Sequence, residues 1–322
     1  MSKLQNFQVR DAFGLPDIPE KMLAVGYADA TNPFIPSKNE GYVFRKDFLR
    51  EVLAFLKSPC GDALFVTGPT GSGKTSGICE IAARLNWPVQ QLTAHGRMEL
   101  ADLIGHHALV STAPGQAPVM QFMYGALAIA MREGHILLIN EVDMLDPSEL
   151  SGLNDVLEGR PLVISQNGGE VIKPHPMFRV VVTGNSTGAG DDSGLYQGVL
   201  MQNIAAMDRY RFTRVDYMPT EAETALLEKA TPSLPPVIRE GMVKVANEVR
   251  KLFVGDGTNG GMLSLTMSTR TLVRWAKLTL VFRGAPNALA YALEQALLAR
   301  AKPEEKVAIE RVAKDVFGQQ WQ

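Results

Sequence analysis

The sequence predicts an α/β fold in which a parallel sheet, covered by helices on both faces, is followed by a smaller, all-helical domain. Strand-like apolar runs occur at 63–67, 89–93, 136–140 and 179–184. Helical patterns at 75–86, 122–133 and 147–158 separate them, and such alternation is typical of parallel sheets. A glycine-rich turn joins the first strand to the first of these helices, and beyond residue 220 the pattern is almost wholly helical.

These patterns divide the chain at two places. Residues 1–40 are rich in Pro, Asp and Asn and carry isolated apolar residues, which predicts an extended arm or a small cap. A helix is expected at 45–58, where apolar residues recur at helical spacing, within an α/β nucleotide-binding domain at 41–219. A helical lid domain is expected at 220–322, interrupted by the glycine-rich loop "VGDGTNGGM" (254–262).

Two segments interrupt the alternation of strands and helices. The insert "LVSTAPGQAPVMQF" occupies 109–122, and "GRPLVISQNGGEVIKPHP" occupies 159–176. The second segment predicts a β-hairpin that turns at 167–169, where Asn and two Gly residues follow one another. His106 and His107 precede the insert; two neighbouring residues do not supply convergent metal ligands, so we interpret them as part of a polar loop.

The composition is that of a globular protein with no bias toward a nucleic-acid partner. The 322 residues are 46% hydrophobic and 20% charged, with a formal net charge of -2. The two cysteines, Cys60 and Cys79, have no CxxC or Cys/His companions, which argues against a disulfide scaffold or a zinc site. No apolar stretch reaches membrane-spanning length and the first residues lack a signal-peptide core, so we expect a cytoplasmic protein without membrane contact.

The segment "GPTGSGKTS" (68–76) lies between a strand-like run and a helical pattern and matches GxxxxGK[ST], the pattern of a phosphate-binding loop. Glycines let the backbone amides approach phosphate oxygens, Lys74 supplies a positive charge, and the Thr75 hydroxyl can ligand Mg²⁺. We therefore expect ATP and Mg²⁺ to bind here, with these residues forming the nucleotide site: Gly68, Pro69, Thr70, Gly71, Ser72, Gly73, Lys74, Thr75 and Ser76.

The strand "ILLIN" (136–140) ends next to a candidate catalytic carboxylate, Glu141, which can polarise a water for attack on the γ-phosphate. Asn140 stands where such sites usually carry an aspartate that anchors the hydration shell of Mg²⁺. Its amide oxygen can accept a hydrogen bond from a metal-bound water but brings no charge, and Asp143 can restore some local negativity. Two interpretations stay open: a slower working ATPase, or a nucleotide-binding subunit that hydrolyses little.

Three further residues are candidates for the catalytic set. Asn185 ends the strand at 179–184, where an amide could orient water between Glu141 and the γ-phosphate. Arg209, within an arginine cluster at 209–214, could reach the γ-phosphate of a neighbouring subunit. Arg270, at the start of a helix in the lid, could report the state of the nucleotide. Each also has a plain structural interpretation, as a turn former or as a surface arginine.

With these parts in order, the chain resembles the AAA+ ATPases of the MoxR branch, and within them the CobS-like proteins. Matching stretches span most of the chain: "VRDAFG", "ARLNWP", "DLIG", "VIKPHPMFR", "GAGDDSGLYQG", "QNIAAMDR" and "MSTRTLVRWA". The resemblance implies Walker A (68–75), Walker B (136–141), sensor one (Asn185), an arginine finger (Arg209) and sensor two (Arg270).

The resemblance also implies partners. CobS-like proteins form hexameric rings and work with a von Willebrand A-type, CobT-like partner, and in cobaltochelatases ATP hydrolysis drives cobalt insertion into a corrin ring. The segments 109–122 and 159–176 would then face the pore or the partner. Asn140 departs from the acidic residue of the family. Three functions are therefore considered: an ATP-driven motor, an ATP-regulated scaffold, and a nucleic-acid translocase, which the absence of Lys and Arg from 109–122 disfavours.

Overall fold

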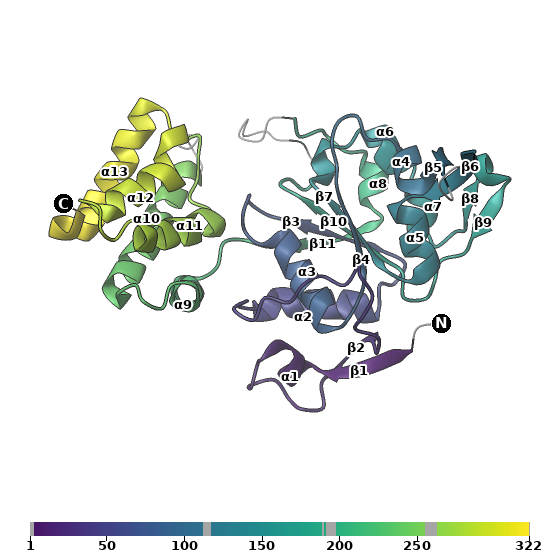
Figure 1. Cartoon of the computed structure of the whole chain (residues 1–322), viewed down its shortest axis with the longest axis horizontal. Coiled ribbons are helices and arrows are strands. Elements are labelled where there is room, and N and C mark those ends of the chain that lie inside the picture. Colours follow the sequence, from purple (N-terminus) through teal and green to yellow (C-terminus); the bar gives the residue numbers. More distant parts are fainter. Residues whose placement is uncertain (1–2, 112–116, 189, 191–197, 255–262, 322) are drawn as a thin grey trace. The chain divides into compact units, whose positions relative to one another are not determined.

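The computed structural model describes residues 3–111, 117–188, 190, 198–254 and 263–321. The chain divides into two compact units, of which the first comprises 1–39, 44–68 and 74–215 and the second 40–43, 69–73 and 216–322. Figure 1 shows the sheet of the first unit and the helices of the second. The middle of the insert 109–122 (112–116), all but one residue of the loop 254–262, and most of 188–198 lie outside the described residues.

The first unit is built on a five-stranded parallel sheet in the order β11-β3-β10-β7-β4. The strands are β3 (Ala63–Thr67), β4 (Val89–Thr93), β7 (Ile136–Asn140), β10 (Arg179–Gly184) and β11 (Tyr210–Arg214). Four of the five have the bounds that the sequence predicted, which confirms the parallel α/β fold. The edge strand β11 was missed, because its "YRFTR" alternation was interpreted only as an arginine cluster.

Alternate residues of the central strands enter two separate apolar cores, one on each face of the sheet. Leu64, Val66 and Leu138 face one core, whereas Phe65 and Ile139 face the other. The first core is completed by α2 (Lys46–Lys57) and α3 (Lys74–Arg84), and the second by α5 (Ala126–Glu133) and the short α6 (Pro147–Ser151) and α7 (Asn154–Leu157). Figure 1 shows these two groups of helices on opposite sides of the sheet.

Three smaller antiparallel sheets surround the main sheet. They pair β1 (Leu4–Gln8) with β2 (Leu23–Tyr27), β5 (Gly105–Val110) with β6 (Val119–Tyr124), and β8 (Leu162–Ile164) with β9 (Glu170–Ile172). The last pair confirms the hairpin predicted at 159–176. The pair β5–β6 corrects two expectations: His106 and His107 lie on a strand rather than in a loop, and the helix expected from 122 begins only at Ala126.

Short helices fill the connections of the first unit. They are α1 (Val9–Phe13), α4 (Leu100–Ile104) and α8 (Ile204–Met207), with 3-10 turns η1 (Val142–Met144) and η2 (Ser165–Asn167). The helix expected at 147–158 is two helices, α6 and α7, separated at Gly152 and Leu153.

Among the described residues of the second unit, the regular elements are all helices. Its helices are α9 (Thr220–Ala230), α10 (Pro236–Val254), α11 (Thr269–Val281), α12 (Ala288–Ala296) and α13 (Pro303–Phe317), with η3 (Leu298–Arg300) and η4 (Gly318–Trp321). Inside this unit the Arg250 guanidinium forms two hydrogen bonds with the carboxylate of Glu223, at 2.7 and 2.8 Å, and both side chains are buried. Among the described helices of both units, none is long and apolar enough to cross a membrane.

Candidate ATP-hydrolysis site

The phosphate loop begins where β3 ends, at a glycine that no other residue could replace. Gly68 has a φ of +146°, and a Cβ on it would lie 2.1 Å from the carbonyl oxygen of Val215. Gly71 and Gly73 also have positive φ values, +69° and +92°, which L-residues with a side chain rarely adopt. The glycines at these positions are therefore required by the path of the backbone, and that path leads directly into the N-terminus of α3.

Lys74, the first residue of α3, is buried although it carries a charge. Its Nζ donates to the carbonyl oxygen of Gly68 at 2.7 Å and to Oδ1 of Asn185 at 2.9 Å. These two acceptors come from the ends of neighbouring parallel strands, β3 and β10. The ammonium group is thus held at the carboxyl edge of the sheet, where ligands of open α/β sheets bind.

Thr75 and Asn140, the two residues expected to hold Mg²⁺, lie in direct contact. The Thr75 hydroxyl donates to Oδ1 of Asn140 at 2.6 Å, and the Thr183 hydroxyl donates to the same oxygen at 3.3 Å. On its other side, Nδ2 of Asn140 donates to the carbonyl oxygen of Leu92 at 3.2 Å, on the adjacent strand β4. The amide uses both its acceptor and its donor here, and a carboxylate could not make the bond to Leu92.

Glu141 follows β7 in the left-handed region, with a φ of +55°. A residue other than glycine adopts this conformation at a cost of about 1 kcal/mol or more, and functional sites are where such strain concentrates. The Glu141 side chain is exposed, and its Oε2 accepts a hydrogen bond from Nδ2 of Asn185 at 3.0 Å. Asn185 therefore bridges Lys74 through its oxygen and Glu141 through its nitrogen, which joins three of the expected site residues.

Asp143 has a structural role that its sequence position did not reveal. Its buried carboxylate accepts hydrogen bonds from the backbone N–H groups of Asn185 (2.5 Å) and Ser186 (3.1 Å) and from the Ser186 hydroxyl (3.0 Å). Burial raises the pKa of this carboxyl, and the hydrogen bonds oppose that shift. A Cβ on Gly184 would lie 2.6 Å from its Oδ2, so the glycine before Asn185 is the one sequence signal of this close approach.

Arg209 lies at the opposite edge of the sheet from the phosphate loop. Its carbonyl oxygen accepts from the backbone N–H of Ala63, the first residue of β3, whereas the loop follows the last. At about 3.3 Å per residue of a parallel strand, Arg209 is separated from the loop by roughly 15 Å. Its guanidinium binds Oε1 of Glu158 at 2.9 and 2.5 Å and the carbonyl oxygen of Ala205 at 2.5 Å.

Arg270 is the second residue of α11 and its side chain is exposed. It belongs to the second unit, so its role at the nucleotide site stays a prediction. Among the described residues, no group of three or more His, Cys, Asp or Glu side chains could hold a metal ion. The oxygens that fit Mg²⁺ are instead the adjacent hydroxyl of Thr75 and amide oxygen of Asn140, which are the hard ligands this ion prefers.

Comparisons with known proteins agree with this geometry. A family described as the AAA domain of the dynein-related subfamily matches residues 63–197, and one described as the CbbQ/NirQ/NorQ C-terminal region matches 223–316. The aerobic cobaltochelatase subunit CobS of Sinorhizobium sp. is 30% identical over 317 residues, which cover 96% of this chain and 90% of that protein. An uncharacterized protein of Staphylococcus haemolyticus is 31% identical over 189 residues, 59% of this chain and 68% of that protein.

The solved structures that resemble the chain include a variant of RuvB from Thermotoga maritima, with a TM-score of 0.51 and 13% sequence identity. The alignment covers 86% of this chain and 73% of that one, and at this identity it speaks for the fold alone. Fold, phosphate loop and family matches together define an ATPase built on a P-loop α/β core with a helical C-terminal region. Because the similarity to CobS extends over nearly the whole of both proteins, the chain belongs to the MoxR branch of the AAA+ ATPases.

Proposed function

We propose that this chain is the ATP-hydrolysing subunit of a homo-oligomeric ring, a hexamer, that remodels a partner complex. The observation that carries the proposal is the contact set at the carboxyl edge of the sheet. There Asn185 joins the ammonium group of Lys74 to the carboxylate of Glu141, and Thr75 contacts Asn140. The carboxyl edge of the sheet thus holds a positive charge, a general base and a pair of metal-binding oxygens, which are the groups that hydrolysis of a nucleoside triphosphate requires.

The proposed mechanism assigns one task to each of these side chains. The Glu141 carboxylate, oriented by Nδ2 of Asn185, accepts the proton of the water that attacks the γ-phosphorus. The bond from that phosphorus to the β–γ bridging oxygen breaks, and the electron pair stays with ADP. Lys74 stabilises the negative charge on the phosphate oxygens. Thr75, directly, and Asn140, through water, would hold Mg²⁺, which when bound neutralises charge on the β- and γ-phosphates.

Two features of the Arg209 region support a ring. The Arg209 backbone lies roughly 15 Å along β3 from the phosphate loop of its own chain, and its guanidinium is bound to Glu158 and Ala205. We therefore infer that it acts on the nucleotide of a neighbour. Met201 and Ile204, a few residues before it, are 71% and 86% exposed and offer apolar surface for a subunit contact. We propose that an adjacent subunit covers them and receives Arg209.

Two hairpins supply surfaces for a client or partner. Leu109 and Met120 lie opposite each other on β5 and β6 and are 69% and 64% exposed, and Val163 and Val171 form a similar exposed pair on β8 and β9. By the similarity to CobS, the partner would be a von Willebrand A-type, CobT-like protein. The work performed would be cobalt insertion into a corrin, or the maturation of another metalloenzyme. Exposed apolar pairs favour a protein client over nucleic acid.

A second function, an ATP-regulated scaffold, is favoured by Asn140 alone. Without the negative charge of an aspartate, Mg²⁺ is held less strongly, so binding could assemble the ring while turnover stays negligible. The two functions differ in what ATP does after it binds.

The test is steady-state ATP hydrolysis with Mg²⁺, together with nucleotide binding, for the native chain and Glu141→Gln. A motor shows turnover that Glu141→Gln lowers by about 100-fold or more, because a general base contributes that much, while ATP binding persists. The scaffold predicts almost no turnover in either protein and ring assembly that still depends on ATP. Absence of adenine-nucleotide binding by the native chain would refute both functions.

A further inference from the structure

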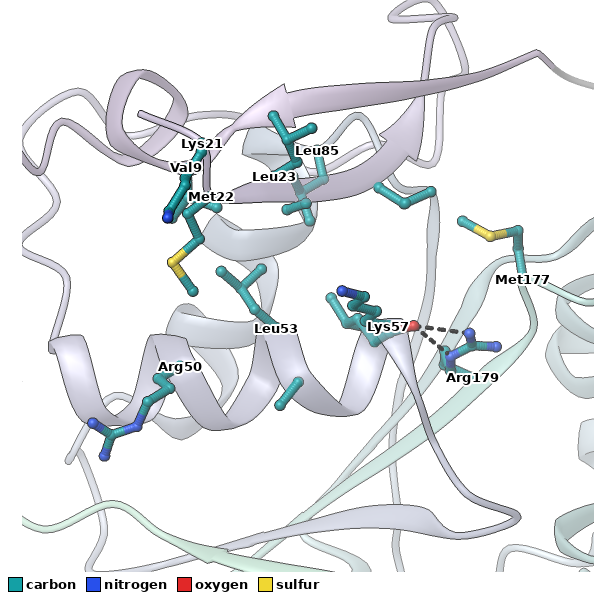
Figure 2. Close-up of a pocket in the computed structure, with 14 residues that line it drawn as sticks. Val9, Lys21, Met22, Leu23, Arg50, Leu53, Lys57, Leu85, Met177 and Arg179 are labelled. Atoms are coloured by element: carbon teal, nitrogen blue, oxygen red, sulfur yellow. Dashed lines mark hydrogen bonds between the residues drawn. The ribbon is translucent and has the colours of Figure 1, made fainter. Parts of the chain in front are cut away.

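A pocket of about 460 Å³ lies on the face of the first unit away from the nucleotide, between the N-terminal hairpin and α2. Figure 2 shows β2 on one side of it and α2 on the other, with Leu85 beside Leu23 and Met177 at one end. Ten of its fourteen lining residues are apolar, including Met22, Leu23 and Leu53. Met22 and Leu23 are 41% and 49% exposed, so the apolar surface extends from the pocket onto its rim.

The strand that borders the pocket has a free edge there. The backbone N–H of Val9 donates to the carbonyl of Met22, and the N–H of Ala28 donates to the carbonyl of Lys3. Because hydrogen-bonded pairs alternate along an antiparallel ladder, the even-numbered residues of β2 are the ones whose backbone groups bond to β1. The backbone groups of Leu23 and Val25 therefore point away from β1, toward α2 and the pocket. Further along the same edge, Tyr27 N–H donates to the carbonyl of Leu85, which closes the edge at that end.

No backbone partner is recorded for the N–H and C=O groups of Leu23 and Val25 on this side, among the residues described. An unpaired strand edge beside an apolar pocket can accept an extended segment, whose main chain bonds the strand while alternate side chains enter the pocket. The hairpin β1–β2 would then become a three-stranded sheet.

The charges around the pocket are all positive among its described lining residues: Lys21, Arg50, Lys57 and Arg179. Arg50 forms an ion pair with Asp47 on its own helix, and in Figure 2 its guanidinium points away from the pocket. For Lys21 and Lys57 no ion pair is recorded among the described residues. These two lysines thus remain available to an acidic ligand.

Arg179 is the buried member of this set, with 8% of its surface exposed. Its guanidinium donates to the carbonyl oxygens of Leu56, Pro176 and Phe178, so each recorded hydrogen bond goes to a neutral group. Figure 2 shows it at the end of the pocket nearest to Met177. A buried guanidinium with Lys57 nearby gives this end of the pocket a positive potential that suits a carboxylate, whereas Lys21 lies at the other end (Figure 2).

We propose that this pocket binds an extended segment of a partner protein, in which apolar residues alternate with glutamate or aspartate. The segment pairs with the edge of β2 at Leu23 and Val25, and its apolar side chains enter the pocket toward Leu53. Its carboxylates project from the other face of the segment, where the long, exposed side chains of Lys57 and Lys21 at the pocket rim can reach them. This docking surface is separate from the nucleotide site and from the two hairpins β5–β6 and β8–β9.

The test measures binding of a fluorescein-labelled heptapeptide that alternates Glu with Val or Leu, by anisotropy, to the full-length chain. We expect a Kd below about 1 mM at low salt and weaker binding as salt screens the charges. Lys57→Glu should weaken binding about tenfold, which corresponds to about 1.4 kcal/mol. Arg50→Glu, on the same helix with its side chain directed away, is the matched control and should change the Kd by less than about twofold.

Two further measurements keep the outcome decisive. Ala54→Phe, which fills the pocket without changing charge, should weaken binding as much as Lys57→Glu, with thermal melting used to verify that each variant folds. A peptide N-methylated at alternate amides should not bind; equal binding would mean that the pocket takes any amphipathic anion, which overturns strand pairing. The proposal is also overturned if Lys57→Glu and Arg50→Glu weaken peptide binding equally. It is likewise overturned if no peptide binds and Lys57→Glu abolishes self-assembly, because the occupant of the pocket is then a second copy of the chain.

Discussion

Asn140→Asp is the substitution for which the structure gives the sharpest prediction, because it would restore the residue usual in related sites. In the native chain the amide is buried, with Oδ1 accepting from Thr75 and Thr183 and Nδ2 donating to the carbonyl of Leu92. An aspartate keeps the first two bonds and loses the third. Its second oxygen then faces the Leu92 carbonyl at the 3.2 Å that now separates donor from acceptor.

The loss can be given a magnitude. Replacing a buried donor with an unpaired, charged acceptor costs about 1–3 kcal/mol. Charge-assisted bonds from the two hydroxyls are stronger than neutral ones and offset part of this, which leaves about 1–2 kcal/mol. For a unit of this size each kcal/mol lowers the Tm by roughly 2–4 °C. We therefore expect the nucleotide-free Asn140→Asp protein to melt roughly 2–8 °C below the native chain.

Adding nucleotide should narrow this difference in Tm. With Mg²⁺ and ADP, the introduced charge gains a cation, so the Tm increase on adding ligand should be larger for Asn140→Asp than for the native chain. Differential scanning fluorimetry measures both temperatures, and lowering the pH narrows the nucleotide-free difference because a protonated carboxyl can donate to Leu92. An unchanged or higher Tm without nucleotide would refute the reasoning that the amide is held by its bond to Leu92.

Other variants test other parts of the site. Arg209→Ala should keep ATP binding and lower the rate of hydrolysis about 100-fold or more. The control Glu158→Gln breaks the same ion pair but leaves the guanidinium, so it should retain activity. Equal losses of activity in both variants would contradict catalysis between subunits. Asp143→Asn should lower kcat about tenfold and change the Kd for ATP by less than about twofold. The reason is that an amide nitrogen cannot accept the hydrogen bonds that the turn at 185–186 donates. A change in the Kd alone would argue against a role of Asp143 in positioning Asn185. Burial lowers the pKa of His135 below 6.5, so its contribution to stability is present above that pH and is lost as the pH falls. His135→Gln should therefore lessen the drop in Tm between about pH 7.5 and 5.5, and the exposed His106→Gln should not.

The sequence predicted the strands that are apolar throughout and bounded by turn residues. The runs at 63–67 and 136–140 are buried at every position, so composition alone marks them. The hairpin at 159–176 was found through its Asn and two Gly residues, of which Gly168 and Gly169 do have positive φ values. The family resemblance placed Glu141 and Asn185 in order along the chain, and the structure brings them within 3.0 Å.

What could not be predicted depends on exposed or tertiary features. The edge strand β11 carries Arg211 and Arg214 between apolar residues, and its pairing with β3 outweighs that polar pattern. The strands β5 and β6 expose Leu109 and Met120, which reverses the usual rule that apolar residues mark the buried face. The contact of Asp143 with the turn at 185–186 depends on the backbone path after two different strands, which no spacing in the sequence encodes.

Asn140 and Asp143 together set the charge at the strand ends that would hold the nucleotide. With an aspartate at position 140, the empty site would hold a second buried carboxylate near the one at 143, and like charges that close disfavour ionisation. In this chain position 140 is an uncharged amide. The buried carboxylate of Asp143 accepts from three donors in the turn at 185–186 and interacts electrostatically with Lys74. On the proposed mechanism, Asn140 therefore makes the nucleotide-free protein more stable than an aspartate would, and it makes the affinity for Mg²⁺ lower. It follows that Asn140→Asp should speed hydrolysis and destabilise the empty protein together, and a variant that did only one would separate the two effects.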